Sequence, residues 1–321
     1  MHASVYRSPD LDGSQGTVAL QSFHERRTGM REVALVIVAA LATSTLEAQR
    51  PEAAAGDWSA VEQALGRRGL SQPGGVIRFG FPRGDLHVSI GDLELLPAFA
   101  LGSWVAFTRH GATATMMGDI VLTADEITPV VDRLTQNGVD VTALHNHLLG
   151  ESPHVMYVHI HGHGVPTRLA ETVHAALALT KTPLGQPPAV LAVRVDLDTA
   201  AIARVLGVAG RVSGGVYQVS VPRTGVIREG GQEVPPAMGV ATAINFQPTG
   251  EGKAAITGDF VMTSNEVQAV QRTLRANHIT ITALHSHMTG ESPRLLFMHF
   301  WAVDDVMVLA RGLRAALDVS R

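Results

Sequence analysis

Cysteine is absent from the 321 residues of this chain. No disulfide can therefore staple the fold, and a chain of this length buries enough apolar surface to fold without one. The same absence excludes a thiol nucleophile and the lipid-anchored cysteine of bacterial lipoproteins. Any metal site must be built from nitrogen and oxygen ligands.

The sequence also lacks an excess of positive charge and two common catalytic signatures. A net charge of −4 provides no basic field for a polyanion, so we expect no nucleic-acid partner. Neither a Gly-x-Ser-x-Gly motif nor a phosphate-binding glycine loop occurs, which removes the commonest serine-hydrolase and nucleotide-binding signals. The remaining partners are a small molecule or a metal ion.

The N-terminal region has the pattern of an export signal. Three arginines (Arg26, Arg27 and Arg31) precede the apolar run 33–42, and small and polar residues follow it. This run of ten is too short for a membrane span, which needs about 20 apolar residues, but it suits a secretory signal. We therefore predict a signal peptide or disordered N-terminus over residues 1–48 and an extracytoplasmic location, periplasmic or secreted. The alternative is a buried N-terminal helix.

The chain repeats itself at a spacing of 140 residues. Between Gly118–Pro153 and Gly258–Pro293, 17 of 36 positions are identical without a gap, which indicates an internal duplication. We place one repeat at 57–182, a Pro- and Gly-rich linker at 183–187 and a second repeat at 188–321. Such a chain resembles a fused dimer with pseudo-twofold symmetry, so we expect a monomer.

Each repeat carries the same succession of patterns. A short helix comes first (58–65 and 199–206), and segments with period-2 or continuous apolar character follow, which predicts strands. Two Thr-x-x-Glu capping boxes, at Thr123–Glu126 and Thr263–Glu266, mark the start of the next helix. Two strands and a final helix close the unit. We predict an α+β fold in which each repeat is a mainly antiparallel sheet with helices on one face.

Histidine is concentrated in one hairpin-sized stretch. The segment 142–164 contains six of the fifteen histidines of the chain. If Leu149 pairs with Val155, the antiparallel register places His145 opposite His159, with Cβ atoms about 5 Å apart. The histidines predicted to converge in the first repeat are His145, His147 and His159, with His161 as a further ligand. The second repeat offers His285, His287 and His299.

Three converging neutral imidazoles are typical of a divalent-metal site. Zinc fits best, and iron, manganese or copper fit the same ligand types. The carboxylates that recur beside them could complete the ligand set or act as a general base. These catalytic candidates are Glu151 and Asp119, with Glu291 and Asp259 as their equivalents. Two sites, one composite site, or one working and one decayed site all remain open.

Structural roles compete with each of these assignments. Strand histidines are often hydrogen-bonded core or surface residues, Glu151 could be a solvated turn carboxylate, and Asp119 could form an Asx turn at a strand end. We assign Glu126 and Glu266 to helix capping. Arg83 and Arg223 also recur and suit an ion pair within each repeat better than an anion site.

Several segments together carry a family resemblance. They are "GDIVLTADEITPVV", "VTALHNHLLGESPHVMYVHIHG" and the doubled "GGV…VPR", and they resemble the LppY/LpqO-type domain, a bacterial family of unknown function, here as two tandem copies of a half-repeat. The resemblance implies an exported bacterial protein and supplies no catalytic residues. This chain departs from the lipoprotein members because it has no lipobox cysteine.

Three functions fit these observations. The first is a metal-dependent enzyme that activates water or a carbonyl, with the histidines as metal ligands. The second is an extracytoplasmic protein that binds a metal or small ligand without catalysis. The third is a structural module of the cell envelope in which the histidines form a buried polar network.

Overall fold

The computed structural model describes residues 57–186 and 193–320. The predicted signal peptide over 1–48, the end of the predicted linker and the first residues of the second repeat lie outside the described residues. Within the described part the two halves have the same architecture, and each combines one six-stranded antiparallel sheet with three helices. The predicted α+β fold is confirmed.

The two large sheets have equivalent strand orders. In the first half the order is β1 (Leu70–Gln72), β2 (Val76–Pro82), β5 (Gly102–His110), β6 (Thr113–Thr123), β9 (Val155–Gly164) and β7 (Asp140–His145). In the second half it is β10 (Arg211–Ser213), β11 (Val216–Pro222), β14 (Ala241–Gly250), β15 (Lys253–Thr263), β18 (Leu295–Asp305) and β16 (Thr280–His285). In both halves, the strand that carries His159 (β9) or its equivalent His299 (β18) is therefore the neighbour of an edge strand.

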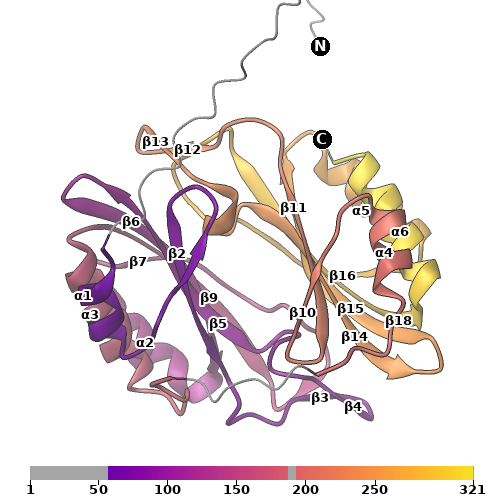
Figure 1. Cartoon of the computed structure of the whole chain (residues 1–321), viewed down its shortest axis with the longest axis horizontal. Coiled ribbons are helices and arrows are strands. Elements are labelled where there is room, and N and C mark those ends of the chain that lie inside the picture. The colour runs from indigo at the N-terminus through magenta and orange to yellow at the C-terminus, as the bar shows by residue number, and fades with distance from the viewer. Residues whose placement is uncertain (1–56, 187–192, 321) are drawn as a thin grey trace, which may run out of the picture. The chain divides into compact units, whose positions relative to one another are not determined.

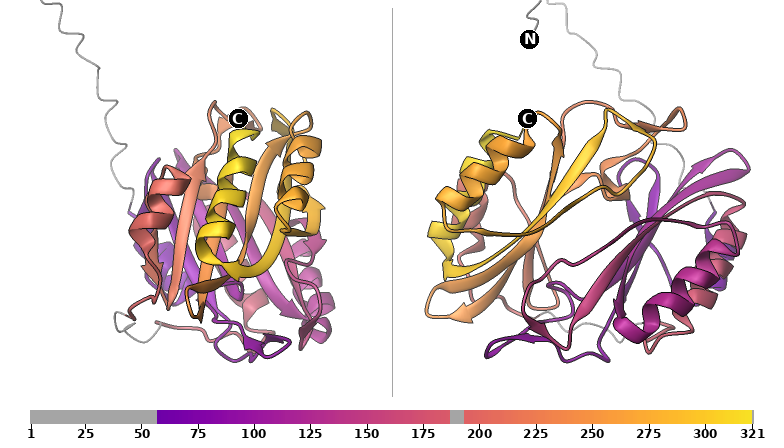
Figure 2. Two further views of the ribbon diagram at one scale, coloured as in Figure 1. Left: turned by 90° about the vertical axis from the view of Figure 1, so that its right-hand side faces the viewer. Right: turned by 180° about the vertical axis from the view of Figure 1, so that it is seen from behind.

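The helices cover only the outer face of each sheet (Figures 1 and 2). They are α1 (Ser59–Leu65), α2 (Ala124–Thr135) and α3 (Pro166–Leu177) in the first half, and α4 (Thr199–Leu206), α5 (Val267–Ala276) and α6 (Val306–Asp318) in the second. Their apolar stripes pack on the sheets, as Val130 and Leu134 of α2 do in the first core. No helix in the described part is both long and apolar enough to cross a membrane.

The inner faces of the two sheets pack against each other. One apolar cluster joins Ala106 and Met117 of the first half to Val261 and Phe297 of the second. Another joins Tyr157 to Val216 and other residues of the second half. The result is a helix–sheet–sheet–helix arrangement with pseudo-twofold symmetry, in which residues on the two inner faces meet at the middle of the molecule.

The connection between β7 and β9 differs from the predicted hairpin. The strand ends at His145 instead of Leu149, and His145 pairs with Tyr157 while His159 pairs with Ala143. Two causes are visible: a register shift lies between Val141 and Ala143, and the chain then leaves the sheet to form β8 (Glu151–Ser152). The predicted pairing of Leu149 with Val155 is therefore wrong.

Short strands beside the large sheets hold the loops that cross between the halves. One three-stranded sheet contains β4 (Leu93–Glu94), β3 (Ser89–Ile90) and β8, and the other contains β13 (Gln232–Glu233), β12 (Arg228–Glu229) and β17 (Glu291–Ser292). A 3-10 turn, η1 (Pro236–Met238), reaches from the second half to β2, β5 and β6 of the first.

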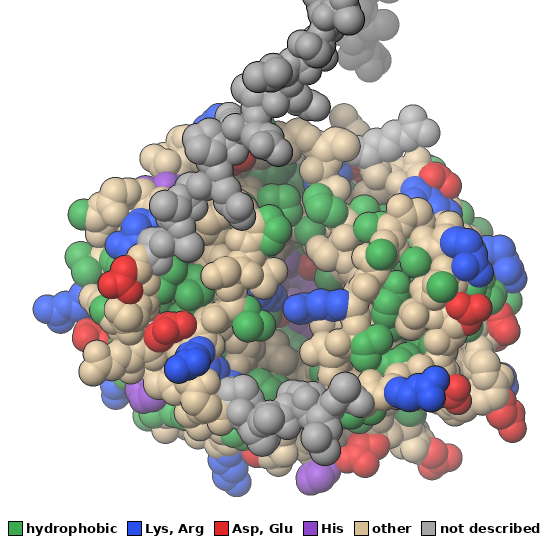
Figure 3. Space-filling model, viewed as in Figure 1, with side chains coloured by type: hydrophobic (Ala, Val, Ile, Leu, Met, Phe, Trp, Pro, Cys, Tyr) green, Lys and Arg blue, Asp and Glu red, His purple; other side chains and the backbone are tan. Residues whose placement is uncertain are grey.

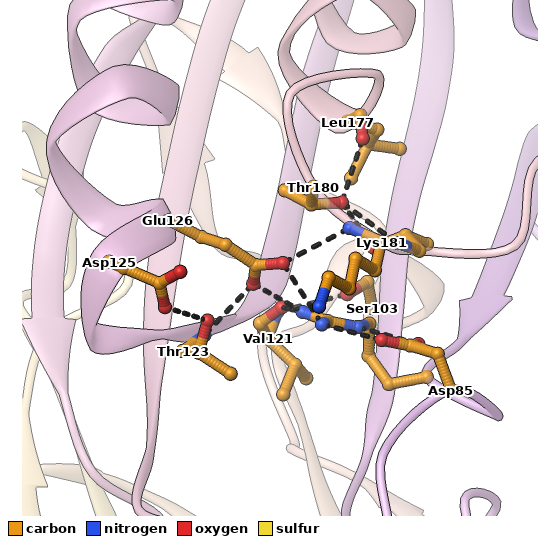
Figure 4. A network of polar contacts seen from close by, with 11 residues as sticks. Asp85, Ser103, Val121, Thr123, Asp125, Glu126, Leu177, Thr180 and Lys181 are labelled. Atoms are coloured by element: carbon orange, nitrogen blue, oxygen red, sulfur yellow. Dashed lines mark hydrogen bonds and ion pairs between the residues drawn. The ribbon is translucent and has the colours of Figure 1, made fainter.

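A buried ion pair joins the start of α2 to the strands beneath it, as predicted. Arg83 is completely buried, and its guanidinium contacts the carboxylate of Glu126 at 2.7 Å and that of Asp85 at 2.8 Å. Glu126 also accepts hydrogen bonds from the backbone N–H groups of Thr123 and Lys181 (Figure 4). The predicted capping box of α2 is present. In the second half Arg223 pairs with Glu266 at 2.8 Å, so neither recurring arginine forms an isolated anion site.

Candidate metal centre

One row of side chains crosses the inner face of each sheet. Asp119 of β6 lies directly opposite His159 of β9, and Asp259 lies opposite His299 in the same way. Residues paired across antiparallel strands present their side chains to the same face. Asp119 is in the middle of β6, so the alternative of an Asx turn at a strand end does not apply.

The remaining histidines of the first repeat lie at the end of β7 and just after it, and those of the second repeat lie at the end of β16 and just after it. His145 faces the same side as His159, because its partner Tyr157 is two residues from His159 on one strand. His147 follows the end of the strand and stacks on the ring of Tyr157 with centroids 3.4 Å apart. In the second half His287 stacks on Phe297 at the same distance of 3.4 Å.

The two sets of three histidines meet in one composite centre. Ring centroids lie 3.8 Å apart for His145 and His285, which are equivalent residues of the two repeats. The other contacts between the repeats pair His147 with His299 at 3.7 Å and His159 with His287 at 3.8 Å. Every imidazole of the centre thus contacts one from the other repeat.

The spacing of the nitrogen atoms suits a metal ion. The Nε2 atoms of His145 and His147 are 3.1 Å apart, and those of His159 and His285 are 3.2 Å apart. Two ligands of one tetrahedral zinc, with bonds of about 2.0–2.1 Å, have nitrogen atoms about 3.3–3.4 Å apart. Four overlapping groups of three side chains bring their ligand atoms within 4.8 Å of one another: His145/His159/His285, His145/His147/His299, Asp119/His147/His159 and Asp259/His285/His287.

Backbone carbonyls fix the orientation of three of the rings. The Nδ1 atom of His159 lies 3.3 Å from the carbonyl oxygen of Gly118, and that of His299 lies 2.8 Å from the carbonyl of Gly258. His287 Nδ1 lies 3.0 Å from the carbonyl oxygen of Gly239. Because a carbonyl can only accept, these Nδ1 atoms carry the proton and leave Nε2 free to bind a metal, which is the usual arrangement around metal-binding histidines.

Burial favours the uncharged form of four imidazoles of the centre, His145, His147, His159 and His285. It lowers the pKa of His145 to about 2, with help from the nearby His299 and His287. Burial and the neighbouring histidines also hold the pKa values of His147, His159 and His285 well below the ordinary value for histidine. Neutral imidazole is the form that binds a metal, so these four histidines have their ligand form at neutral pH.

Two buried carboxyl groups, Asp119 and Asp259, lie beside the histidines of the centre. Burial, together with the charge of Asp259, raises the pKa of Asp119 to about 8. Asp119 Oδ2 lies 3.4 Å from His147 Nε2, and Asp259 Oδ2 lies 3.0 Å from His287 Nε2. The second oxygen of each carboxylate is buried and accepts no hydrogen bond among the described residues. Unpaired buried carboxylate oxygens are costly, and a divalent cation removes that cost.

Three of the predicted site residues lie outside these groups. Glu151 is buried in the turn, where its Oε1 accepts from Val155 N at 3.3 Å and contacts His154 Nδ1 at 2.6 Å. Glu291 accepts in the same way from the N–H of Leu295 at 2.9 Å. His161 contacts Glu229 of the second half at 2.9 Å. The structure thus brings together the six histidines and two aspartates, and it places these three side chains in other contacts.

Several residues that shape the centre are not recognisable as functional in the sequence. Gly118 and Gly258 recur in the duplication, and their recurrence was the available signal. Thr142 and Thr282 also recur, and each donates to a carbonyl of the other repeat. The stacking rings differ between the repeats, Tyr157 in one and Phe297 in the other, so their role depends on shape and not on a hydroxyl.

The surface is hollowed between the two halves that contribute to the centre. Figure 3 shows this hollow between the two halves, in the region between β2 and β11 of Figure 1. Histidine side chains are visible at its bottom, and side chains of the lysine or arginine class reach into it.

The duplication corresponds to a known family. The pattern described as Domain of Unknown Function (DUF1259) matches residues 59–179 and again residues 200–319. The chain belongs to the DUF1259 family. No curated protein and no solved structure matches it. The two copies of DUF1259 coincide with the two halves that share the centre, so the composite cluster is built from one contribution by each copy.

Proposed function

We propose that the composite centre binds a divalent metal ion, zinc being the best fit, and that the protein is a metal-dependent enzyme. The observation that carries this proposal is the convergence of six histidines and two aspartates from both repeats, with their ligand atoms within metal-binding distance of one another. A metal held there would supply Lewis-acid activation of water or a carbonyl. Iron, manganese and copper are compatible with the same nitrogen and oxygen ligands.

The side chains of the centre would have two roles, metal binding and proton transfer. Rings anchored by backbone carbonyls, such as His159 and His299, are rigid ligands. Asp119 and Asp259 are the carboxylates placed either to complete the ligand set or to accept a proton from water. Glu151 and Glu291 accept hydrogen bonds from the nearby backbone N–H groups of Val155 and Leu295. The two aspartates are therefore the better candidates for the catalytic carboxylates.

A second candidate function is metal binding without catalysis. Eight ligands exceed what one catalytic ion with an open position requires. Two of the groups, Asp119/His147/His159 and Asp259/His285/His287, have no residue in common and would suit two ions held at once. A coordination shell saturated by protein would favour storage or transport, and an open position would favour the enzyme.

Metal analysis of the protein purified without a His tag tests the proposal. We expect at least one equivalent of a divalent metal per chain, and a loss of at least about 10-fold in affinity in His145→Ala, because losing even an outer-shell partner costs 10- to 100-fold. His87→Ala is the matched control, because His87 is exposed and pairs with Glu94. Unchanged metal content and melting temperature in His145→Ala would contradict both metal-binding functions and leave only the structural module of the cell envelope.

The equivalent variants distinguish a composite centre from two independent sites. His145 and His285 stack on each other across the repeats. In a composite centre, His145→Ala and His285→Ala each weaken binding of all the metal. Independent sites would instead leave about half of the metal bound with unchanged affinity in each single variant.

We also propose that the protein is exported and belongs with the LppY/LpqO-type proteins. Support comes from the arginine-flanked apolar run at residues 26–42 and from the segments quoted above. Cell fractionation with and without residues 1–48 tests the export. Retention of the full-length chain in the cytoplasm would contradict it.

A monomer is the oligomeric state that we propose. Because both halves of the centre come from one chain, no second copy is required to complete it. Light scattering coupled to size-exclusion chromatography would give the mass directly, and a dimer mass would contradict this proposal.

A further inference from the structure

Beside the centre, the pseudo-twofold symmetry is broken at the position of Arg78. Arg78 of β2 and Gln218 of β11 occupy equivalent positions, and each donates to a backbone carbonyl of the other half. Arg78 Nη1 donates to Ala237 O at 3.1 Å, and Gln218 Nε2 donates to Ala98 O at 2.9 Å. Gln218 shows that an amide is sufficient for this crossing contact. The guanidinium therefore supplies N–H donors and a charge beyond what the crossing contact needs.

The guanidinium lies beside the histidine cluster. Its central carbon is 3.6 Å from the centroid of the Trp104 ring, on which it stacks. Trp104 is paired with Asp119 across β5 and β6. Its ring edge also approaches Gly239, since a Cβ at that glycine would lie 2.7 Å from Trp104 and 3.9 Å from His287 Nδ1. Arg78, which is half-buried, thus neighbours Trp104, and Trp104 in turn neighbours His287 of the centre.

The charge of Arg78 is not paired with a carboxylate in the described part of the chain. Among residues 57–186 and 193–320, no carboxylate oxygen lies within 4.0 Å of it. Arg83, by contrast, pairs with Glu126 and Asp85. Arg67, like Arg78, has no carboxylate partner in the described part of the chain, but its guanidinium donates to three backbone carbonyls, whereas Arg78 donates to one.

The surroundings of Arg78 favour an incoming anion. Burial, with the like charge of Arg211, lowers the pKa of Arg78 to about 10, and Asp119 opposes this shift. Arg78 therefore keeps its charge at neutral pH. Two guanidinium groups close enough for their charges to interact concentrate positive potential around them, although the whole chain is acidic.

We propose that Arg78, assisted by Arg211, binds an oxyanion group, a carboxylate or a phosphate, and that the substrate of the centre carries such a group. A guanidinium fixed by stacking presents its N–H donors in the planar fork that matches these groups. The anion would sit against Trp104, with the rest of the molecule directed toward His287 and the metal. The substrate class rests on the proposed function, whereas the anion site itself does not.

Titration of the full chain with inorganic phosphate and, separately, with acetate tests the site. The measurements are calorimetry and tryptophan fluorescence at constant ionic strength, on metal-free and metal-loaded protein. We expect saturable binding of at least one of the two anions, and about 10- to 100-fold weaker binding in Arg78→Gln, which installs the residue found at the equivalent position of β11. Arg109→Gln is the matched control, because Arg109 stacks on Trp58 at 4.5 Å, away from the centre.

The outcomes separate the anion site from the metal site. Arg78-dependent binding by metal-free protein supports the anion site even if no metal is ever found, in which case the proposed function fails alone. If the protein binds metal with normal affinity and Arg78→Gln does not change the anion affinity, the proposed anion site is wrong and the metal centre stands. The anion that binds more tightly shows whether a carboxylate or a phosphate is recognised.

Discussion

The hydroxyl of Thr142 donates a hydrogen bond to the carbonyl oxygen of His287 in the other repeat, at 2.7 Å. The equivalent Thr282 donates to the carbonyl of His147 at 2.6 Å. Thr142 lies at the register shift of β7, so the irregularity that ends the regular pairing also turns a side chain toward the partner repeat. Each repeat therefore holds in place a metal-ligand candidate of the other.

Removing one of these hydroxyls should loosen the centre. Thr142→Val keeps the β-branched shape but leaves the His287 carbonyl without its donor. We expect about 1 kcal/mol less stability and about 10-fold weaker metal binding, as for other outer-shell partners, measured by competition with a chelator. Thr135→Val is the control, since that hydroxyl donates to Val131 O on the exposed side of α2. Equal metal affinity in the two variants would contradict the coupling.

The glycine beneath His287 provides a second test. Gly239 has φ +94°, and an added Cβ would lie 2.7 Å from the Trp104 ring. Gly239→Ala must therefore displace the carbonyl that anchors His287, and we expect metal affinity to fall by about 10-fold or more. Gly230→Ala controls for backbone strain, because Gly230 has φ +56° and an added Cβ there meets no atom within 4 Å. Both variants should lose about 1–2 kcal/mol of stability to strain, but only Gly239→Ala should lose metal.

Part of the centre could be predicted from the sequence because an error of two residues in the strand register does not change the face on which a side chain lies. The predicted register paired His145 with His159, whereas His145 pairs with Tyr157. This is a shift of two residues along β9, and a shift of two preserves the face on which a side chain lies, while a shift of one would reverse it. His145 and His159 therefore lie on a common face, as the sequence predicts, although they are not paired with each other.

The rest of the centre depends on how the two sheets pack, which a single repeat does not encode. The stacking of His145 on His285 joins positions 140 residues apart in sequence, and nothing in the histidine spacing distinguishes this contact from two separate sites. The role of Glu151 was also hidden, because its carboxylate turns back to Val155 N and not toward the histidines. The sequence did not indicate a functional role for Arg78, because the equivalent residue in the second repeat is Gln218 and the arginine does not recur.

Replacing the turn carboxylate should affect folding and not the metal. Glu151→Ala leaves the Val155 N–H without its acceptor at a buried position, so we expect a loss of about 1–3 kcal/mol of stability. Metal content should equal that of the unmodified protein. Glu291→Ala should behave alike, because Glu291 accepts from the N–H of Leu295 at 2.9 Å. A variant that keeps its stability but loses metal would return Glu151 to the ligand set.

Acid stability should depend on the ion pair between Arg83 and Glu126. Burial alone would raise the pKa of Glu126, but the hydrogen bonds from Arg83, Thr123 and Lys181 outweigh it and lower that pKa. A carboxyl group whose pKa is lower in the folded than in the unfolded chain stabilises the fold above the unfolded value of about 4.3 and loses this contribution as the pH falls through the folded value. The free energy of unfolding, measured by urea titration between about pH 2 and 6, should therefore fall less steeply toward acid in Glu126→Gln. Glu171→Gln on α3 removes the same charge at an exposed position and should keep the steeper fall, and identical slopes for the two variants would show that Glu126 contributes nothing to acid stability.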